Sequence, residues 1–135
     1  MFMLANNDVA SQDIVQNQLS DINTTSRDLM VPQVQEVSPA PGKLVRQTLE
    51  GYKATDVYHL LYLPTNWEAG KKYPVIVEYL GNGPWSNEIG DVSIGKIDGC
   101  NLGYGLSSGK NFIWVSIPFI SEDGLQNQNC WWGDV

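Results

Sequence analysis

The sequence contains few charged residues, and most of those it contains are acidic. Asp, Glu, Lys and Arg make up 17% of the 135 residues, and 15 acidic against 8 basic residues give a formal net charge of -7. Proteins bind phosphate backbones and anionic lipid surfaces mainly through Lys and Arg. The composition therefore predicts no nucleic-acid partner and argues against binding to anionic membrane surfaces.

Long apolar runs, histidine and cysteine are also scarce. No stretch reaches the roughly 18 apolar residues that a membrane-spanning helix needs, so we expect no membrane span. His59 is the single histidine, and Cys100 and Cys130 are the only cysteines. Two Cys and one distant His do not make a zinc site, so we expect neither a metal nor a cofactor. The cysteines can remain free thiols or close the intervening loop with a disulfide, and the sequence leaves both open.

The first 42 residues differ in composition from the rest. Residues 1–38 are rich in Asn, Gln, Ser, Asp and Thr, with no aromatic residue after Phe2, and residues 38–42 form a Pro-rich linker. Such compositions are typical of weakly ordered segments and stiff linkers. We predict a flexible or weakly helical leader and linker over residues 1–42 and a folded domain over residues 43–135.

Apolar runs after the linker predict strands. Their expected positions are residues 44–49 (an edge strand), 57–63, 73–80 and 112–118. The near-continuous apolar run 73–80 suits a strand that is covered on both faces. The stretch 84–110 is rich in Gly and Asn and reads as a long loop with room for a crossover helix. We expect residues 112–118 to form an unpaired apolar edge.

Residues 63–77, which read Leu-Pro-Thr-Asn-Trp-Glu-Ala-Gly-Lys-Lys-Tyr-Pro-Val-Ile-Val, resemble the start of the catalytic domain in α/β-hydrolases of the prolyl oligopeptidase and esterase type. Those domains carry a strand ending in Leu-Pro, a polar turn, Lys-Lys-Tyr-Pro, an apolar strand, a Gly-rich loop and another apolar strand. Here the loop is residues 81–84 and the last strand is 112–118, so the resemblance covers about residues 56–120. It implies an α/β fold that contains the first strands of an α/β-hydrolase sheet.

The Gly-rich loop is the candidate site that the resemblance implies. In this fold the loop after the third strand supplies a backbone N–H to the oxyanion hole. Glycine allows the backbone to approach a developing negative charge at hydrogen-bond distance. Gly81, Asn82 and Gly83 are therefore the oxyanion-loop candidates, and a plain tight turn is the alternative. Leu80 stands where many members have His, which leaves open which amide points inward.

We expect no catalytic residue in this chain. Residues 105–109, Gly-Leu-Ser-Ser-Gly, match G-x-S-x-G, but a nucleophile elbow follows a buried strand and opens a helix. Here a predicted coil, residues 100–104, comes before Ser107 and a strand comes after it. His59 lies inside a predicted strand, where a half-buried structural role is typical. We therefore expect the chain to stop before the catalytic Ser, Asp and His of the family and to be inactive alone.

The leading hypothesis is a fragment of a serine hydrolase that acts on ester or peptide bonds. Its substrate in the full-length protein would be a small-molecule ester or peptide. Trp131, Trp132 and Asp134 are candidates for a substrate pocket, although Asp134 equally suits a helix N-cap. The alternative is a Trp-rich carbohydrate-binding β-domain without catalysis. Such a domain needs a turn about every 8 to 12 residues, and the stretch 84–110 does not provide them.

Overall fold

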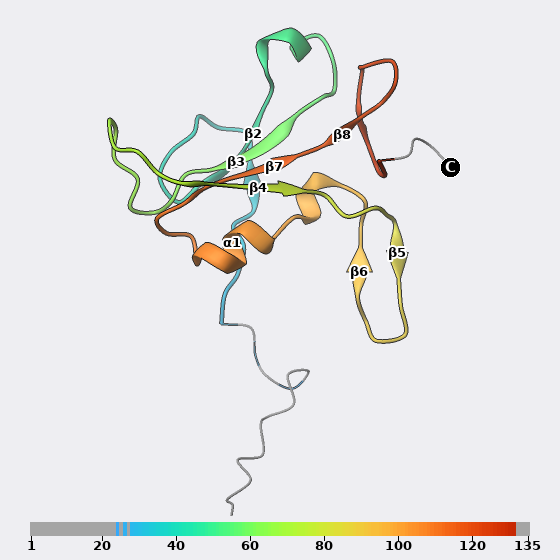
Figure 1. The fold of residues 1–135 in the computed structure, drawn as a ribbon, viewed down its shortest axis with the longest axis horizontal. Coiled ribbons are helices and arrows are strands. Elements are labelled where there is room, and N and C mark those ends of the chain that lie inside the picture. The colour runs from blue at the N-terminus through green and yellow to red at the C-terminus, as the bar shows by residue number, and fades with distance from the viewer. Residues whose placement is uncertain (1–23, 25, 27, 132–135) are drawn as a thin grey trace, which may run out of the picture.

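The computed structural model describes residues 24, 26 and 28–131, which form a mixed α/β fold around a five-stranded sheet (Figure 1). The strands of this sheet are β1 (Val34–Gln35), β2 (Leu44–Gln47), β3 (His59–Tyr62), β4 (Val75–Tyr79) and β7 (Ile113–Ile117). The other elements are β5 (Trp85–Ser86), β6 (Val92–Ser93), β8 (Phe119–Ile120), β9 (Asn127–Gln128), the short 3₁₀ helices η2 (Glu50–Tyr52) and η3 (Ile97–Gly99), and the helix α1 (Leu102–Ser107). The sequence therefore predicted the broad α/β class correctly.

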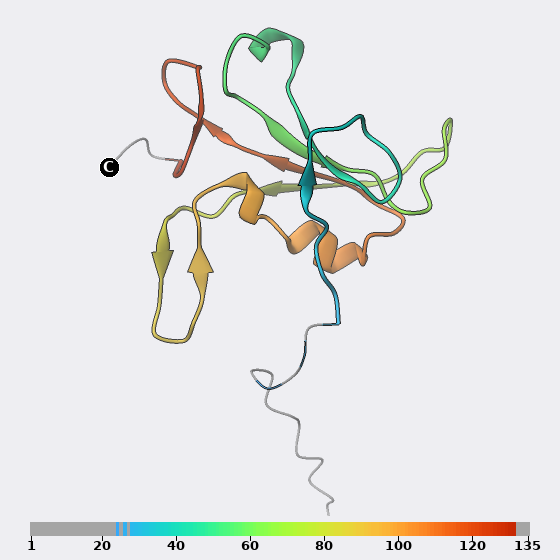
Figure 2. The ribbon, with the colours of Figure 1, turned by 180° about the vertical axis from the view of Figure 1, so that it is seen from behind.

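The sheet has the strand order β1-β2-β3-β7-β4. β2 and β7 each pair antiparallel with β3, whereas β4 pairs parallel with β7. A parallel pair requires a crossover connection, and residues 80–112 provide it. The crossover contains α1, which lies on one face of the sheet, and the β5–β6 hairpin, which projects away from the sheet (Figures 1 and 2). We call residues 85–93 the β5–β6 arm.

The core lies between the sheet and α1. Leu60, Tyr62, Trp114 and Ser116 point to this face and are fully buried. The ring of Tyr104 in α1 meets Tyr62 edge-on at 5.3 Å and lies 6.5 Å from the ring of Trp114. These aromatic contacts fix the helix against β3 and β7.

A carboxylate from β4 determines where α1 begins. Glu78 accepts hydrogen bonds from the backbone N–H groups of Asn101, Leu102 and Gly103 at 3.2, 3.2 and 2.9 Å. The first N–H groups of a helix have no partner inside the helix, and a negative charge stabilises them. The side chain of Asn101, at the N-cap position, makes no capping bond of its own. Glu78 therefore takes over the role of the cap, and the predicted coil over residues 100–104 is wrong from Leu102 onward.

The other face of the sheet is largely bare beside β4. Val75, Val77 and Tyr79 point to it and are 54%, 51% and 64% exposed. The prediction that this strand is covered on both faces is therefore wrong. The predicted edge is wrong as well, because β7 lies between β3 and β4 and the outermost strand on this side is β4.

Part of the predicted leader and linker belongs to the folded domain. β1 pairs with β2, and Val31 and Val34 pack against the core. The N–H of Gly42 donates to the carbonyl of Leu63 at 2.9 Å. The domain thus begins before residue 43, and β2 is not the edge strand that the sequence predicted. Residues 1–23 of the predicted leader lie outside the described residues.

Candidate functional site

The Gly-rich loop lies at the carboxyl edge of the parallel pair. It follows β4 directly, and Tyr79 at the end of β4 is in register with Ile117 at the end of β7. The ring of Tyr79 also stacks on Phe119 of β8, with 6.4 Å between the ring centroids. In open α/β sheets, ligands bind outside the carboxyl ends of the strands. The loop therefore occupies the part of the fold where a binding site is expected.

Gly83 has a structural reason to be glycine. A Cβ at this position would lie 2.5 Å from the backbone nitrogen of Gly95 and 2.7 Å from the carbonyl oxygen of Ser93. Its N–H donates to the carbonyl of Asn129 at 3.0 Å. Gly83 thus allows the loop to pack against the end of the β5–β6 arm. Its amide is bonded to Asn129 and does not offer a free donor to a ligand.

The other two candidate amides remain open to a ligand. Among the described residues, the backbone N–H groups of Gly81 and Asn82 meet no acceptor. The side-chain oxygen of Asn82 accepts the N–H of Trp131 at 3.1 Å. Of the three predicted pocket residues, Trp131 therefore contacts the loop, and its side chain is 66% exposed. Trp132 and Asp134 lie outside the described residues.

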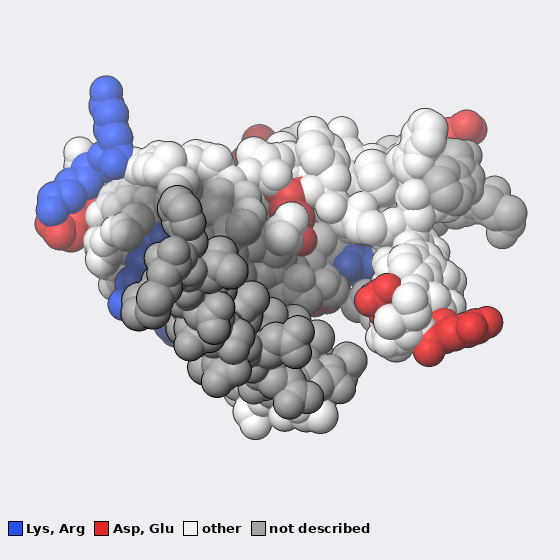
Figure 3. Space-filling model, turned by 60° about the horizontal axis from the view of Figure 1, so that its bottom comes forward, with Lys and Arg blue, Asp and Glu red and all other residues white. Residues whose placement is uncertain are grey.

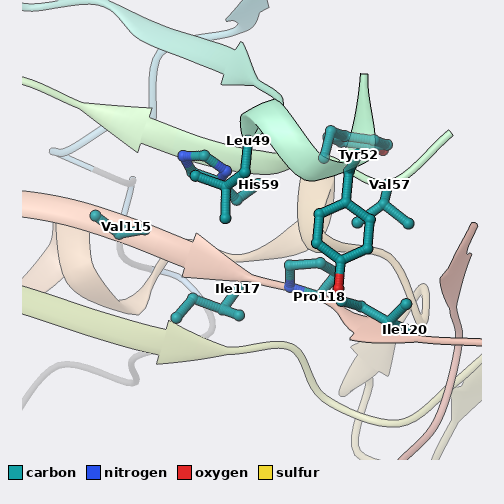
Figure 4. A pocket seen from close by; sticks show the side chains of 9 residues that line it. Leu49, Tyr52, Val57, His59, Val115, Ile117, Pro118 and Ile120 are labelled. Atoms are coloured by element: carbon teal, nitrogen blue, oxygen red, sulfur yellow. The ribbon is translucent and has the colours of Figure 1, made fainter. Parts of the chain in front are cut away.

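An apolar cavity of about 240 Å³ opens at the same edge of the sheet, on the face opposite α1 (Figure 4). Its walls come from the η2 segment, β3, β7 and β8: Leu49, Tyr52, Val57, Tyr58, His59, Val115, Ile117, Pro118 and Ile120. Ile117 connects the cavity to the Gly-rich loop. It lines the cavity and is in register with Tyr79, and Tyr79 lies two residues before Gly81. No local sequence pattern indicates this cavity, since its walls come from three separate segments, residues 49–52, 57–59 and 115–120.

His59 lies in the wall of the apolar cavity. Burial lowers the pKa of its imidazole below 6.5, so the ring is neutral at neutral pH. A catalytic base normally has a partner that orients it. Among the described residues, no hydrogen-bond partner of the imidazole is found.

The lowered pKa of His59 predicts a pH dependence of stability. The unfolded chain binds the proton near the ordinary pKa of 6.5, whereas the folded chain binds it only at lower pH. We expect the free energy of unfolding to decrease as the pH falls below about 6.5, above the range near pH 4 where carboxylates titrate. Urea unfolding at several pH values between about 4 and 6.5 measures this decrease. In His59→Gln the free energy of unfolding should no longer depend on pH in this range, and an unchanged pH dependence would contradict the prediction.

Ser107 has a structural role at the end of α1. Its hydroxyl donates to the carbonyl of Gly103 at 2.8 Å and accepts the N–H of Gly109 at 3.2 Å. Ser108 follows in the left-handed region, with φ 50°. The G-x-S-x-G match therefore closes a helix, whereas a nucleophile elbow opens one.

The other reactive side chains near the core are buried and have structural roles. Cys100 and Cys130 are both buried and form no disulfide with each other, so the disulfide that the sequence left open is not present. Burial and the neighbouring Glu78 raise the pKa of Cys100 to about 11, so its thiolate form is rare at neutral pH. The described residues contain no cluster of His, Cys, Asp and Glu suited to a metal ion, and no helix among them is long and apolar enough to cross a bilayer.

An ionic cluster links β2 to η3 across the core face. Arg46 lies 3.6 Å from Asp98, and its guanidinium is stacked 3.9 Å above the ring of Tyr58. The Tyr58 hydroxyl donates to Asp98 at 2.6 Å, and burial together with this bond raises its pKa to about 12. The cluster holds elements together and presents no open reactive group.

No protein-family model, curated protein or solved structure matches this chain. The geometry of the Gly-rich loop and of the apolar cavity therefore carries the functional argument.

Proposed function

We propose that this chain forms the oxyanion-loop part of a serine hydrolase that acts on ester or peptide bonds. The observation that carries the proposal is the pair of open amides, Gly81 and Asn82, directly after β4 at the carboxyl edge of a parallel β4–α1–β7 unit. This is the position from which an α/β-hydrolase donates one of its oxyanion hydrogen bonds. Backbone N–H groups held there stabilise the negative charge that develops on a reacting carbonyl oxygen.

The apolar cavity favours a substrate that carries an apolar group near the scissile bond. Binding sites are mostly apolar, with a few polar groups that fix orientation. The cavity and the loop share the edge of the sheet through Ile117 and Tyr79. A small ester or peptide could insert an acyl chain or side chain into the cavity while its carbonyl faces the loop.

The proposal assigns the nucleophile and its base to residues outside those described. The hydroxyl of Ser107 is bonded to the backbone of its own helix, and His59 has no orienting partner within the described part of the chain. The carbohydrate-binding alternative has less support. A β-sandwich consists of antiparallel sheets, whereas this chain has a parallel pair with a helical crossover.

Activity measurements test the proposal. The 135-residue chain alone is expected not to hydrolyse p-nitrophenyl acetate above the buffer rate, because none of the residues that the structure describes is a positioned nucleophile. The product of the complete gene is expected to hydrolyse it and to react covalently with a fluorophosphonate at a serine. Ser107→Ala should leave that labelling unchanged. A gene product that reacts with neither probe, or labelling that disappears in Ser107→Ala, would contradict the proposal.

A further inference from the structure

The peptide bond between Gly81 and Asn82 has a bonded carbonyl at one end and an open donor at the other. The hydroxyl of Ser93, the last residue of the β5–β6 arm, donates to the carbonyl of Gly81 at 3.3 Å. The N–H of Asn82 belongs to the same peptide unit and meets no acceptor among the described residues. This peptide bond is trans, so its C=O and N–H point in opposite directions. Because the carbonyl is held toward the arm, the N–H of Asn82 is directed away from the arm.

The hydroxyl of Ser93 is itself held by a backbone amide. It accepts the N–H of Gly95 at 3.4 Å while it donates to the carbonyl of Gly81. Hydrogen bonds that are linked in a chain polarise and strengthen one another. The chain from Gly95 through Ser93 to Gly81 therefore orients the N–H of Asn82 and makes it a stronger donor.

Close backbone contact fixes the base of the arm against the loop. A Cβ on Gly95 would lie 2.7 Å from the carbonyl carbon of Gly83, and a Cβ on Gly81 would lie 3.2 Å from the hydroxyl oxygen of Ser93. Side chains at these positions would push the loop and the arm apart. Glycine therefore brings the loop within hydrogen-bonding reach of Ser93.

The charges of the arm do not suit a role at the loop. Glu88 and Asp91 are exposed in the turn of the arm, and Figure 3 shows acidic side chains on the arm where it projects from the body. A carboxylate repels a developing negative charge. The arm therefore assists the loop through the hydrogen bonds at its base, where Ser93 lies.

We propose that Ser93 is a positioning residue of the oxyanion loop, whose hydroxyl aims the N–H of Asn82 at the reacting carbonyl oxygen. The inference rests on the proposed hydrolase function, in which this amide stabilises the transition state. An oxyanion donor is effective only when it is already oriented toward the place where the negative charge develops. Ser93 supplies that orientation without touching the substrate.

Ser93→Val and Ser93→Thr, compared in the product of the complete gene, test the proposal. The two side chains have nearly the same shape, but only threonine keeps the hydroxyl. Ser93→Val is expected to lower kcat for p-nitrophenyl acetate up to roughly tenfold, the rate equivalent of one net hydrogen bond. KM should change little, because the charge develops only in the transition state. Ser93→Thr should stay close to the wild type.

Ser86→Val is the matched control, because Ser86 is exposed on β5 of the same arm. It should keep the activity of the wild type. Circular dichroism shows whether each variant is folded. If Ser93→Val does not fold, Ser93→Ala replaces it, since alanine removes the hydroxyl without adding bulk.

Two further measurements separate a positioning role from a general structural one. In the 135-residue chain, the NMR chemical shifts of the Gly81 carbonyl carbon and the Asn82 amide nitrogen should change in Ser93→Val but not in Ser93→Thr. This result does not depend on the hydrolase function. In the product of the complete gene, Ser93→Val should cost no further activity when it is combined with Asn82→Pro, which already lacks the amide proton.

The outcomes distinguish the role of Ser93 from the proposed function. A gene product that neither hydrolyses the ester nor reacts with the fluorophosphonate would overturn both. An active, labelled product in which Ser93→Val and Ser93→Thr have equal kcat would overturn the role of Ser93 alone. So would unchanged chemical shifts in Ser93→Val, or a loss of activity that is as large in the presence of Asn82→Pro as in its absence.

Discussion

Gly103→Ala is expected to reduce the free energy of unfolding by about 3 kcal/mol, the upper end of the usual cost of overpacking a core. An added Cβ would lie 2.1 Å from Cδ1 and 2.5 Å from Nε1 of Trp114. Trp114 is fully buried and cannot move aside without disturbing Tyr62 and Tyr104. The loss is large compared with the roughly 5–15 kcal/mol that stabilise a typical domain.

Gly105→Ala gives the control within the same helix. A Cβ at Gly105 would meet nothing within 4 Å. Because alanine favours the helix over glycine by about 0.8–1 kcal/mol, this variant is expected to be at least as stable as the wild type. Urea unfolding followed by tryptophan fluorescence measures both. If the two substitutions change stability equally, the close packing of α1 on Trp114 is not what restricts position 103.

The local sequence predicted strands more successfully than their arrangement. The apolar runs at residues 57–63, 73–80 and 112–118 became β3, β4 and β7. Their order in the sheet depends on pairings between residues far apart in the chain, for which a run of apolar residues carries no signal. An apolar run also shows that a strand can be buried, but not that anything covers it. The three wrong predictions about the sheet, one about a covered face and two about edge strands, have these origins.

The sequence left room for a crossover helix in residues 84–110, but the position of α1 was not predicted, for a related reason. Six residues with two glycines have little intrinsic helix propensity. The helix is held by Glu78, which lies 25 residues before Gly103, and by the fit of Gly103 against Trp114. Tertiary contacts supply most helical stability in proteins, and these contacts are invisible in a local pattern.

The sequence predicted where the Gly-rich loop lies in the chain, but not which of its amides are bonded within the fold. The succession of strand, glycine and strand located the loop at residues 81–84. Which amides remain open depends on Asn129, which engages the N–H of Gly83. Gly83→Val, a natural test of the loop from sequence alone, would force a side chain into the backbone of Gly95. It would therefore report on folding and could not test an oxyanion role.

A test of the oxyanion role has to remove an amide proton without crowding the loop. Asn82→Pro does this, since proline has no N–H. The N–H of Asn82 has no acceptor among the described residues, so the folded chain loses no hydrogen bond there. Its φ is not in the left-handed region, and the preceding residue is glycine, which has no Cβ to clash with the proline ring. Asn82→Ala is the control: it keeps the amide and removes only the side-chain contact to Trp131.

In the product of the complete gene, Asn82→Pro is expected to lower kcat for p-nitrophenyl acetate by about a hundredfold to a thousandfold, the usual cost of losing one oxyanion donor. KM should change much less, because the negative charge on the carbonyl oxygen develops only in the transition state. Asn82→Ala should remain within a few-fold of the wild type, and circular dichroism should show that both variants are folded. If folded Asn82→Pro turns over substrate as fast as Asn82→Ala, the amide of Asn82 does not contact the reacting oxygen. Gly81→Pro would then test the other open amide, and full activity in that variant as well would leave the loop as a turn between β4 and the β5–β6 arm.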